Sequence, residues 1–141
     1  MSQARTVLLD NEAVQALLQP MHRKHRRALA FVEATAARNL RRAGTVRLVV
    51  PTTVRVEAGW DRRAAGADAI NRLRVDDAPL GSRAADLAVP VRVDLGVSVT
   101  DAALAAAVAT APEPHAVITS DAQDLRAIAD HVGTSTTVVI L

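Results

Sequence analysis

Four acidic residues stand beside elements that the surrounding sequence predicts: Asp10, Glu57, Asp101 and Asp121. Asp10 directly follows the apolar run RTVLL, and Asp121 follows the run HAVIT after a single serine. Glu57 lies within two helical turns of the run LVV, and Asp101 lies where a helix begins. Ligand sites in parallel α/β sheets lie beyond the carboxyl ends of the strands. We therefore expect the four side chains to meet in one cleft, provided that the strand order brings them together.

Carboxylates in close contact repel one another, so either their pKa values rise or a cation binds between them. Oxygen ligands without cysteine or a histidine cluster favour Mg²⁺ or Mn²⁺ over zinc. Such a metal can generate a hydroxide nucleophile and stabilise charge on a phosphate during an in-line displacement. The pattern thus predicts that these four acids are both metal ligands and catalytic residues.

Each acid also has a simpler interpretation when it is taken alone. An aspartate at a helix N-terminus is usually a cap, which applies to Asp101 and Asp121. Glu57 alone is typical of exposed helix polarity. Asp10 is more suggestive, because we expect no helix there to need a cap from it. The joint arrangement therefore carries more weight than any single acid.

The elements that must position these acids alternate along the chain. Apolar runs predict strands at RTVLL, GTVRLVVP, HAVITS and STTVVIL. Helical spacing predicts helices at NEAVQALL, at 21–42, at PTTVRVEAGWDRRAAG and at DAQDLRAIADHV. Gly44 is the expected stop signal of the helix over 21–42. A further helix begins at SVTDAALAAAVAT, with Thr100 as its cap and Asp101 in its first turn.

The stretch from 67 to 95 is less regular. We interpret ADAINRLRV and SRAADLAVPVRVDLG as helical pieces around a loop, with VPVRV as an alternative strand. The alternation predicts an α/β fold of three layers, in which helices flank a central, mainly parallel sheet of four to five strands. With no internal repeat or linker, we predict one domain over residues 1–141.

Composition limits the possible classes of protein. Half of the 141 residues are hydrophobic, but one Phe, one Trp and no Tyr leave the core to Ala, Val and Leu. The absence of cysteine excludes disulfides and thiolate metal sites. No apolar window is long enough for a membrane span, and no secretory pattern opens the chain, so we expect a cytoplasmic protein without a membrane partner. The net charge is +2, with basic runs at 22–27 and 38–42, which suits either a nucleic-acid partner or a solvated helix face.

Four segments resemble, in order, the motifs of the PIN-domain family, and of its VapC-type toxins in particular. TVLLDNEAVQALL resembles the opening strand with its first acid, here Asp10, and LVVPTTVRVEAGW resembles the second motif, here with Glu57. VSVTDAALAAAV is similar to the third motif, with Asp101. AVITSDAQDLRAIA is similar to the fourth, with Asp121 and with Asp124 as a secondary acid.

The resemblance implies a PIN-like fold and a Mg²⁺- or Mn²⁺-dependent endoribonuclease that cleaves single-stranded RNA, usually as a homodimer. It also implies a protein antitoxin as partner, within a type II toxin–antitoxin pair. One position departs from the family pattern. Glu12 stands where a serine or threonine commonly supports the metal site. Glu12 either adds a ligand or points away as ordinary helix polarity.

Several residues are weaker candidates for contacts with RNA. They are Arg55, Arg62 and Arg63, on the predicted Glu57 helix, and Ser120. Trp60 offers a ring for base stacking, although packing in the core or in a dimer is the more common role of a tryptophan. His115 is interpreted as structural or solvent-facing.

Two other classes of function compete with the nuclease. A catalytically drifted PIN-like module that binds RNA or protein is supported only by Glu12. A phosphoacceptor signalling domain also gathers acids at strand ends, but it needs a lysine beside them. The only lysine is Lys24, inside an early basic run, so we set this class aside.

Overall fold

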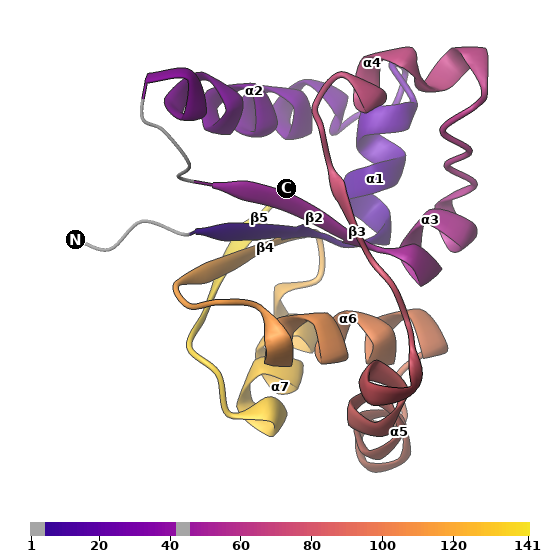
Figure 1. The fold of residues 1–141 in the computed structure, drawn as a ribbon, viewed down its shortest axis with the longest axis vertical. Helices are drawn as coiled ribbons and strands as arrows, with labels where there is room; N and C mark the ends of the chain where they lie inside the picture. Colours follow the sequence, from indigo (N-terminus) through magenta and orange to yellow (C-terminus); the bar gives the residue numbers. More distant parts are fainter. Residues whose placement is uncertain (1–4, 42–45) are drawn as a thin grey trace.

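A five-stranded sheet lies between two layers of helices in the computed structural model, which describes residues 5–41 and 46–141 (Figure 1). Gly44, the expected helix stop, and the side chains of the basic run at 38–42 lie outside what is described. The strands are β1 (Thr6–Leu9), β2 (Arg47–Pro51), β3 (Asp76–Ala78), β4 (His115–Thr119) and β5 (Thr136–Ile140). All neighbouring strands run parallel, in the order β3-β2-β1-β4-β5. The predicted α/β fold of three layers around a parallel sheet is confirmed.

The central strands are buried on both faces, as their uninterrupted apolar sequences require. In β1, Val7 and Leu9 pack into one core, whereas Leu8 between them packs into the other. In β4, Ile118 and Val117 divide between the same two cores in the same way. Successive side chains of a strand point to opposite faces, so one short apolar run supports both layers of helices.

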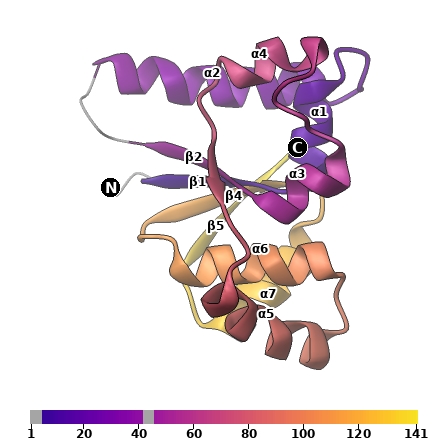
Figure 2. The ribbon, with the colours of Figure 1, turned by 45° about the vertical axis from the view of Figure 1, so that its right-hand side comes forward.

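The helices form two groups (Figures 1 and 2). Helices α1 (Asn11–Leu18), α2 (His25–Arg41) and α4 (Asp68–Asn71) cover one face of the sheet, and the single 3₁₀ turn η1 (Ala65–Ala67) leads into α4. Helices α5 (Ser82–Leu95), α6 (Val99–Thr110) and α7 (Ala122–Val132) cover the other face. Helix α3 (Thr52–Ala58) follows β2 and packs against both α1 and α6, so it joins the two layers near the carboxyl ends of the strands.

Alanine takes the place of large aromatic residues in the core. Along α6, Ala102, Ala103, Ala105 and Ala106 are all buried, beside Leu104. Small side chains let helix α5 approach α6 closely, and close approach compensates for the small area that each alanine buries. No helix in the described residues is both long and apolar enough to cross a membrane.

The structure corrects three predictions about elements. The helix expected over 51–66 ends at Ala58, because Gly59 adopts a left-handed conformation (φ 71°) that terminates it. The helix expected over 67–75 shortens to α4, and a third strand, β3, follows it. The alternative strand at 89–93 is helical, within α5.

The strand order creates a switch point beside β1. The chain places β2 and β3 on one side of β1 and then returns to place β4 and β5 on the other. In open parallel sheets, the crevice at such a reversal is where ligands bind, beyond the carboxyl ends of the strands. The residues that follow β1 and β4 therefore occupy the most probable position for a site.

Candidate active site

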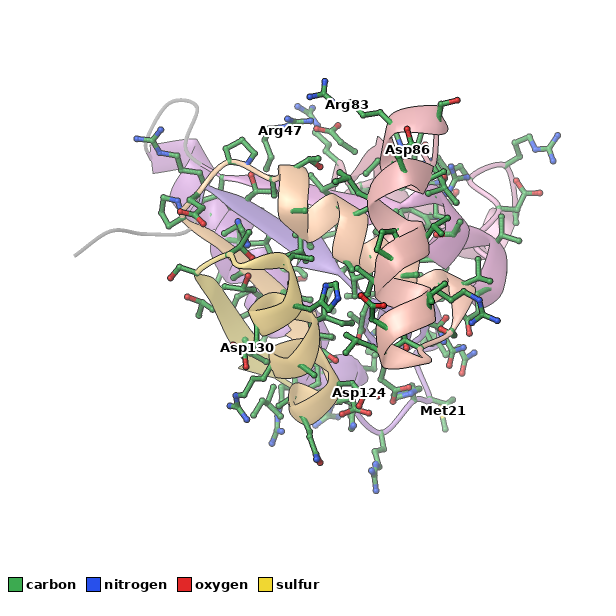
Figure 3. All side chains as sticks on the ribbon, turned by 90° about the horizontal axis from the view of Figure 1, so that it is seen from below. Met21, Arg47, Arg83, Asp86, Asp124 and Asp130 are labelled. Carbon is green, nitrogen blue, oxygen red and sulfur yellow. The ribbon has the colours of Figure 1, made fainter. Side chains whose placement is uncertain are left out.

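Asp10 and Asp121 follow the two adjacent strands at the switch point. The register pairs Leu9 with Ile118, and the Asp10 amide donates a hydrogen bond to the Ile118 carbonyl at 3.3 Å. The sheet therefore brings the first and fourth predicted acids to the same edge, although they come from opposite ends of the chain. Figure 3 labels Asp124 toward one end of the molecule, and Arg47, at the amino end of β2, toward the other.

The Asp10 carboxylate is held in place by its neighbours. Its Oδ1 accepts a hydrogen bond from the Ala13 amide at 2.8 Å, and the Thr119 hydroxyl also bonds to it. Asp10 is thus the N-cap of α1, so the expectation that no helix there needs a cap was wrong. Burial raises the pKa of Asp10 from 3.8 to about 6, against the hydrogen bonds, and repulsion from Glu12 and Asp101 adds to the rise.

Asp101 lies in the first turn of α6, as predicted, and is partly buried. Ser98, rather than Thr100, caps this helix, because its Oγ accepts from the Asp101 amide at 3.0 Å. Burial raises the pKa of Asp101, and repulsion from Asp124, Glu57 and Asp121 adds to the rise, whereas a hydrogen bond from Ser98 opposes it. The predicted acids are therefore near enough to interact.

Asp121 and Glu57 complete the predicted set. Asp121 is the N-cap of α7, with its Oδ1 3.1 Å from the Asp124 amide, and its own amide donates to the Thr119 hydroxyl at 2.9 Å. Glu57 is an exposed residue near the end of α3. Because Glu57, Asp121 and Asp124 all repel Asp101, the acids form one electrostatic group drawn from four elements.

The arrangement has the chemistry of a magnesium or manganese site but not its compact geometry. Its donors are carboxylate oxygens, and they gather at one edge of the sheet with raised pKa values at Asp10 and Asp101. Within the ranges that the structure describes, no three acidic or histidine side chains are arranged as a set that could hold a metal ion. The assignment of the metal ligands therefore remains a prediction.

Glu12 turns toward basic residues of the connection between α1 and α2. Its Oε1 lies 3.3 Å from His22 Nε2 and 3.8 Å from Lys24 Nζ. Its charge also contributes to the raised pKa of Asp10, so it belongs to the same electrostatic group. Whether Glu12 adds a metal ligand or points away from a bound metal stays a prediction. Lys24 Nζ in turn donates a hydrogen bond of 2.7 Å to the Ser120 hydroxyl.

Lys24 belongs to the basic run at 22–27, but nothing in the sequence places it beside the acids. Its position next to Ser120 and Glu12 removes the ground on which the phosphoacceptor class was set aside. Its contact with Ser120 joins positions 96 residues apart, so local pattern gives no signal for it. The one available signal was composition, because Lys24 is the only lysine in a chain that otherwise uses arginine.

Two of the three arginines proposed to contact RNA have internal partners. Arg55 and Arg62 each pair with Asp77 at 2.9 Å, and they lie 5.4 and 4.3 Å from the ring centre of Trp60. Trp60 is 2% exposed, so it belongs to the core and offers no ring for base stacking. Arg63 is 90% exposed and pairs with Asp61. RNA contacts by these arginines and by Ser120 stay predictions.

His115 has a structural position. It is 1% exposed, and its Nε2 lies 2.8 Å from the Thr136 hydroxyl on the neighbouring strand β5. The structural interpretation is therefore correct and the solvent-facing one is wrong.

The fold is similar to that of a solved structure over nearly the whole of both chains. The structure is similar to the crystal structure of VapBC2 from Rickettsia felis bound to a DNA fragment from their promoter, with a TM-score of 0.61 and 11% sequence identity. The similarity covers 96% of this chain and 98% of the other. No family model and no curated protein matches the sequence. The comparison thus shows similarity to VapBC2 at the level of the fold.

Proposed function

We propose that this protein is a metal-dependent endoribonuclease that cleaves single-stranded RNA. The observation that carries the proposal is the mutual repulsion of carboxylates from β1, α3, α6 and α7 at the switch point of a VapC-like fold. Burying like charges together is unfavourable, and one way to relieve it is to bind a cation. The proposed ligands are Asp10, Glu57, Asp101 and Asp121, with Asp124 as a secondary acid.

Each part of the site has a distinct role in this proposal. When bound, Mg²⁺ or Mn²⁺ supplies Lewis acidity for a water nucleophile and for charge that develops on the phosphate. Thr119 and the Ala13 amide hold Asp10 in one orientation, and Ser98 does the same for Asp101. Because no three of the described acids or histidines form a compact set, ion binding must draw the carboxylates closer together.

The biological role that fits the fold is the toxin of a type II toxin–antitoxin pair. The similar structure is named as a VapBC2 complex, and this supports a protein antitoxin as the partner of this chain too. A homodimer also follows from the resemblance. Size-exclusion chromatography coupled to light scattering measures the oligomeric state directly.

Substitution of the acids tests the nuclease proposal. We expect the purified protein to cleave single-stranded RNA with Mn²⁺ or Mg²⁺ and not with EDTA. Asp10→Asn and Asp101→Asn should each reduce the rate by at least about a hundredfold, because charge-stabilising groups typically contribute that much or more. Asp130→Asn, an exposed acid on α7, is the matched control and should cut normally. Unchanged cleavage by folded Asp10→Asn and Asp101→Asn proteins contradicts the proposal.

One observation favours a second candidate, a drifted module that binds RNA or protein without cutting. It is the lack, among the described residues, of three side chains arranged to hold a metal. Such a module should bind RNA equally well with Mn²⁺ and with EDTA, and should leave it intact in both.

A further inference from the structure

Lys24 lies at the carboxyl edge of the sheet, beside the acids. Its Nζ is 2.7 Å from the hydroxyl of Ser120, the residue between Thr119 and Asp121. Thr119 bonds to Asp10, and Asp121 repels Asp101. The ammonium group therefore contacts the segment 119–121, whose first and last residues interact with Asp10 and Asp101.

The orientation of Lys24 is fixed by two partners. Ser120 accepts one of its hydrogen bonds, and Glu12 holds the ammonium by charge at 3.8 Å, a distance too long for a hydrogen bond. An ammonium group has three N–H donors. The contacts of the described residues thus use one donor, and the side chain is 19% exposed, so the ammonium can still meet a ligand from solvent.

The negative charge of the site explains why an ammonium group there would help RNA to bind. Six acids interact there: Asp10, Glu12, Glu57, Asp101, Asp121 and Asp124. RNA brings one negative charge with each phosphate, which such a group repels. Lys24 has a described ion pair with this group, through Glu12. His22 also contacts Glu12, but it is charged only when protonated.

Building on the proposed nuclease function, we propose that Lys24 is a substrate-binding residue that donates to a phosphate oxygen of single-stranded RNA. Ser120 and Glu12 are its positioning residues, because they hold the ammonium in place. A lysine suits this role as a point charge on a flexible stem. The simpler alternative is that Lys24 only ties the α1–α2 connection to the end of β4.

RNA binding by an uncleaving protein separates these two roles. In the Asp101→Asn background with Mg²⁺, Lys24→Met should weaken binding to a labelled random-sequence single-stranded RNA pool by about tenfold, the lower range for a charged hydrogen bond. The slope of log Kd against log salt should fall by about 0.7, the change expected for one lost phosphate contact on a single strand. Lys24→Arg should recover most of the affinity, because it keeps the charge.

Arg23→Met is the matched control, because Arg23 is an exposed basic residue adjacent to Lys24. It should change Kd by less than about twofold and leave most of the salt slope intact. Melting temperatures show whether Lys24→Met remains folded. A folded Lys24→Met protein with the affinity and slope of Arg23→Met overturns the role of Lys24, while cleavage by the parent still supports the nuclease. A parent that neither cuts nor binds RNA overturns both proposals.

Discussion

Asp10 combines two roles whose requirements conflict. As the N-cap of α1 it stabilises the helix, but Glu12 and Asp101 repel its partly buried carboxylate. The pKa of about 6 means that the folded protein holds a proton on Asp10 more tightly than the unfolded chain does. Asp10 therefore stabilises the fold when protonated, at low pH, and this contribution is lost as the pH rises through about 6.

Asp10→Asn should consequently stabilise the protein at neutral pH. A pKa raised from 3.8 to about 6 corresponds to about 3 kcal/mol at most, and asparagine is an equally good N-cap. We expect urea denaturation without metal to show a gain of about 1–3 kcal/mol at pH 7.5 that shrinks toward zero near pH 4. Asp86→Asn, at an exposed position on α5, should show no such pH-dependent gain. A gain of equal size at both pH values contradicts the assignment of the raised pKa to Asp10.

The places of the acids in the fold could be predicted from the sequence because each lies after or within a recognisable element. Asp10 and Asp121 come after apolar runs that had to be strands, and Asp101 opens a helix. The contacts around them could not be predicted. Lys24 and Ser120 meet only because the α1–α2 connection and the end of β4 lie on the same edge of the folded sheet, which no local pattern encodes.

At the scale of elements, α6 depends on a cap that places Asp101. Ser98 accepts from the Asp101 amide and also bonds to its carboxylate. Thr100 had the right residue type but lies inside the first turn. The observed cap, Ser98, lies two residues before the predicted cap, Thr100. Helix ends assigned by different criteria commonly differ by this much.

Ser98→Ala should therefore cost about 1 kcal/mol of stability, the typical contribution of a side-chain cap. It also removes the hydrogen bond that opposes the rise in the pKa of Asp101, so that pKa should move further upward. Thr100→Ala is the matched control and should leave stability nearly unchanged, because alanine is a better helix former than threonine. Thermal unfolding at neutral pH measures both variants. Equal losses from the two substitutions would show that Ser98 is not the cap.

The third strand shows why one element was missed. Strand β3 has the sequence DDA, and both aspartates are exposed, so no apolar run marks it. Its backbone pairs with β2, from Val49 opposite Asp76 to Pro51 opposite Ala78. Asp77 then pairs with Arg55 and Arg62. A strand held by its neighbour's backbone and by ion pairs has no hydrophobic periodicity to detect.

At the scale of the whole molecule, one cation would connect distant parts of the chain. The proposed ligands come from the ends of β1 and β4 and from helices α3 and α6, so an ion bound by them links both helical layers through the sheet. A ligand that binds only the folded state stabilises it in proportion to the logarithm of its concentration above Kd.

Mn²⁺ should accordingly raise the melting temperature by several degrees, since a hundredfold excess over Kd contributes about 2.7 kcal/mol. Asp101→Asn should abolish most of this increase, whereas Asp130→Asn should retain it. Differential scanning fluorimetry with Mn²⁺, Mg²⁺ and EDTA measures the effect. A parent protein whose melting temperature is insensitive to both metals would favour the drifted binding module.

The position of β1 in the sheet also determines when the acids can come together. β1 pairs with β2 on one side, but its other edge stays unpaired until β4 is added from the last part of the chain. During synthesis, the ribosome therefore releases Asp10 and Glu57 long before Asp121 and the strand that positions it. A chain that has not yet added β4 has an open edge on β1 and an incomplete group of acids.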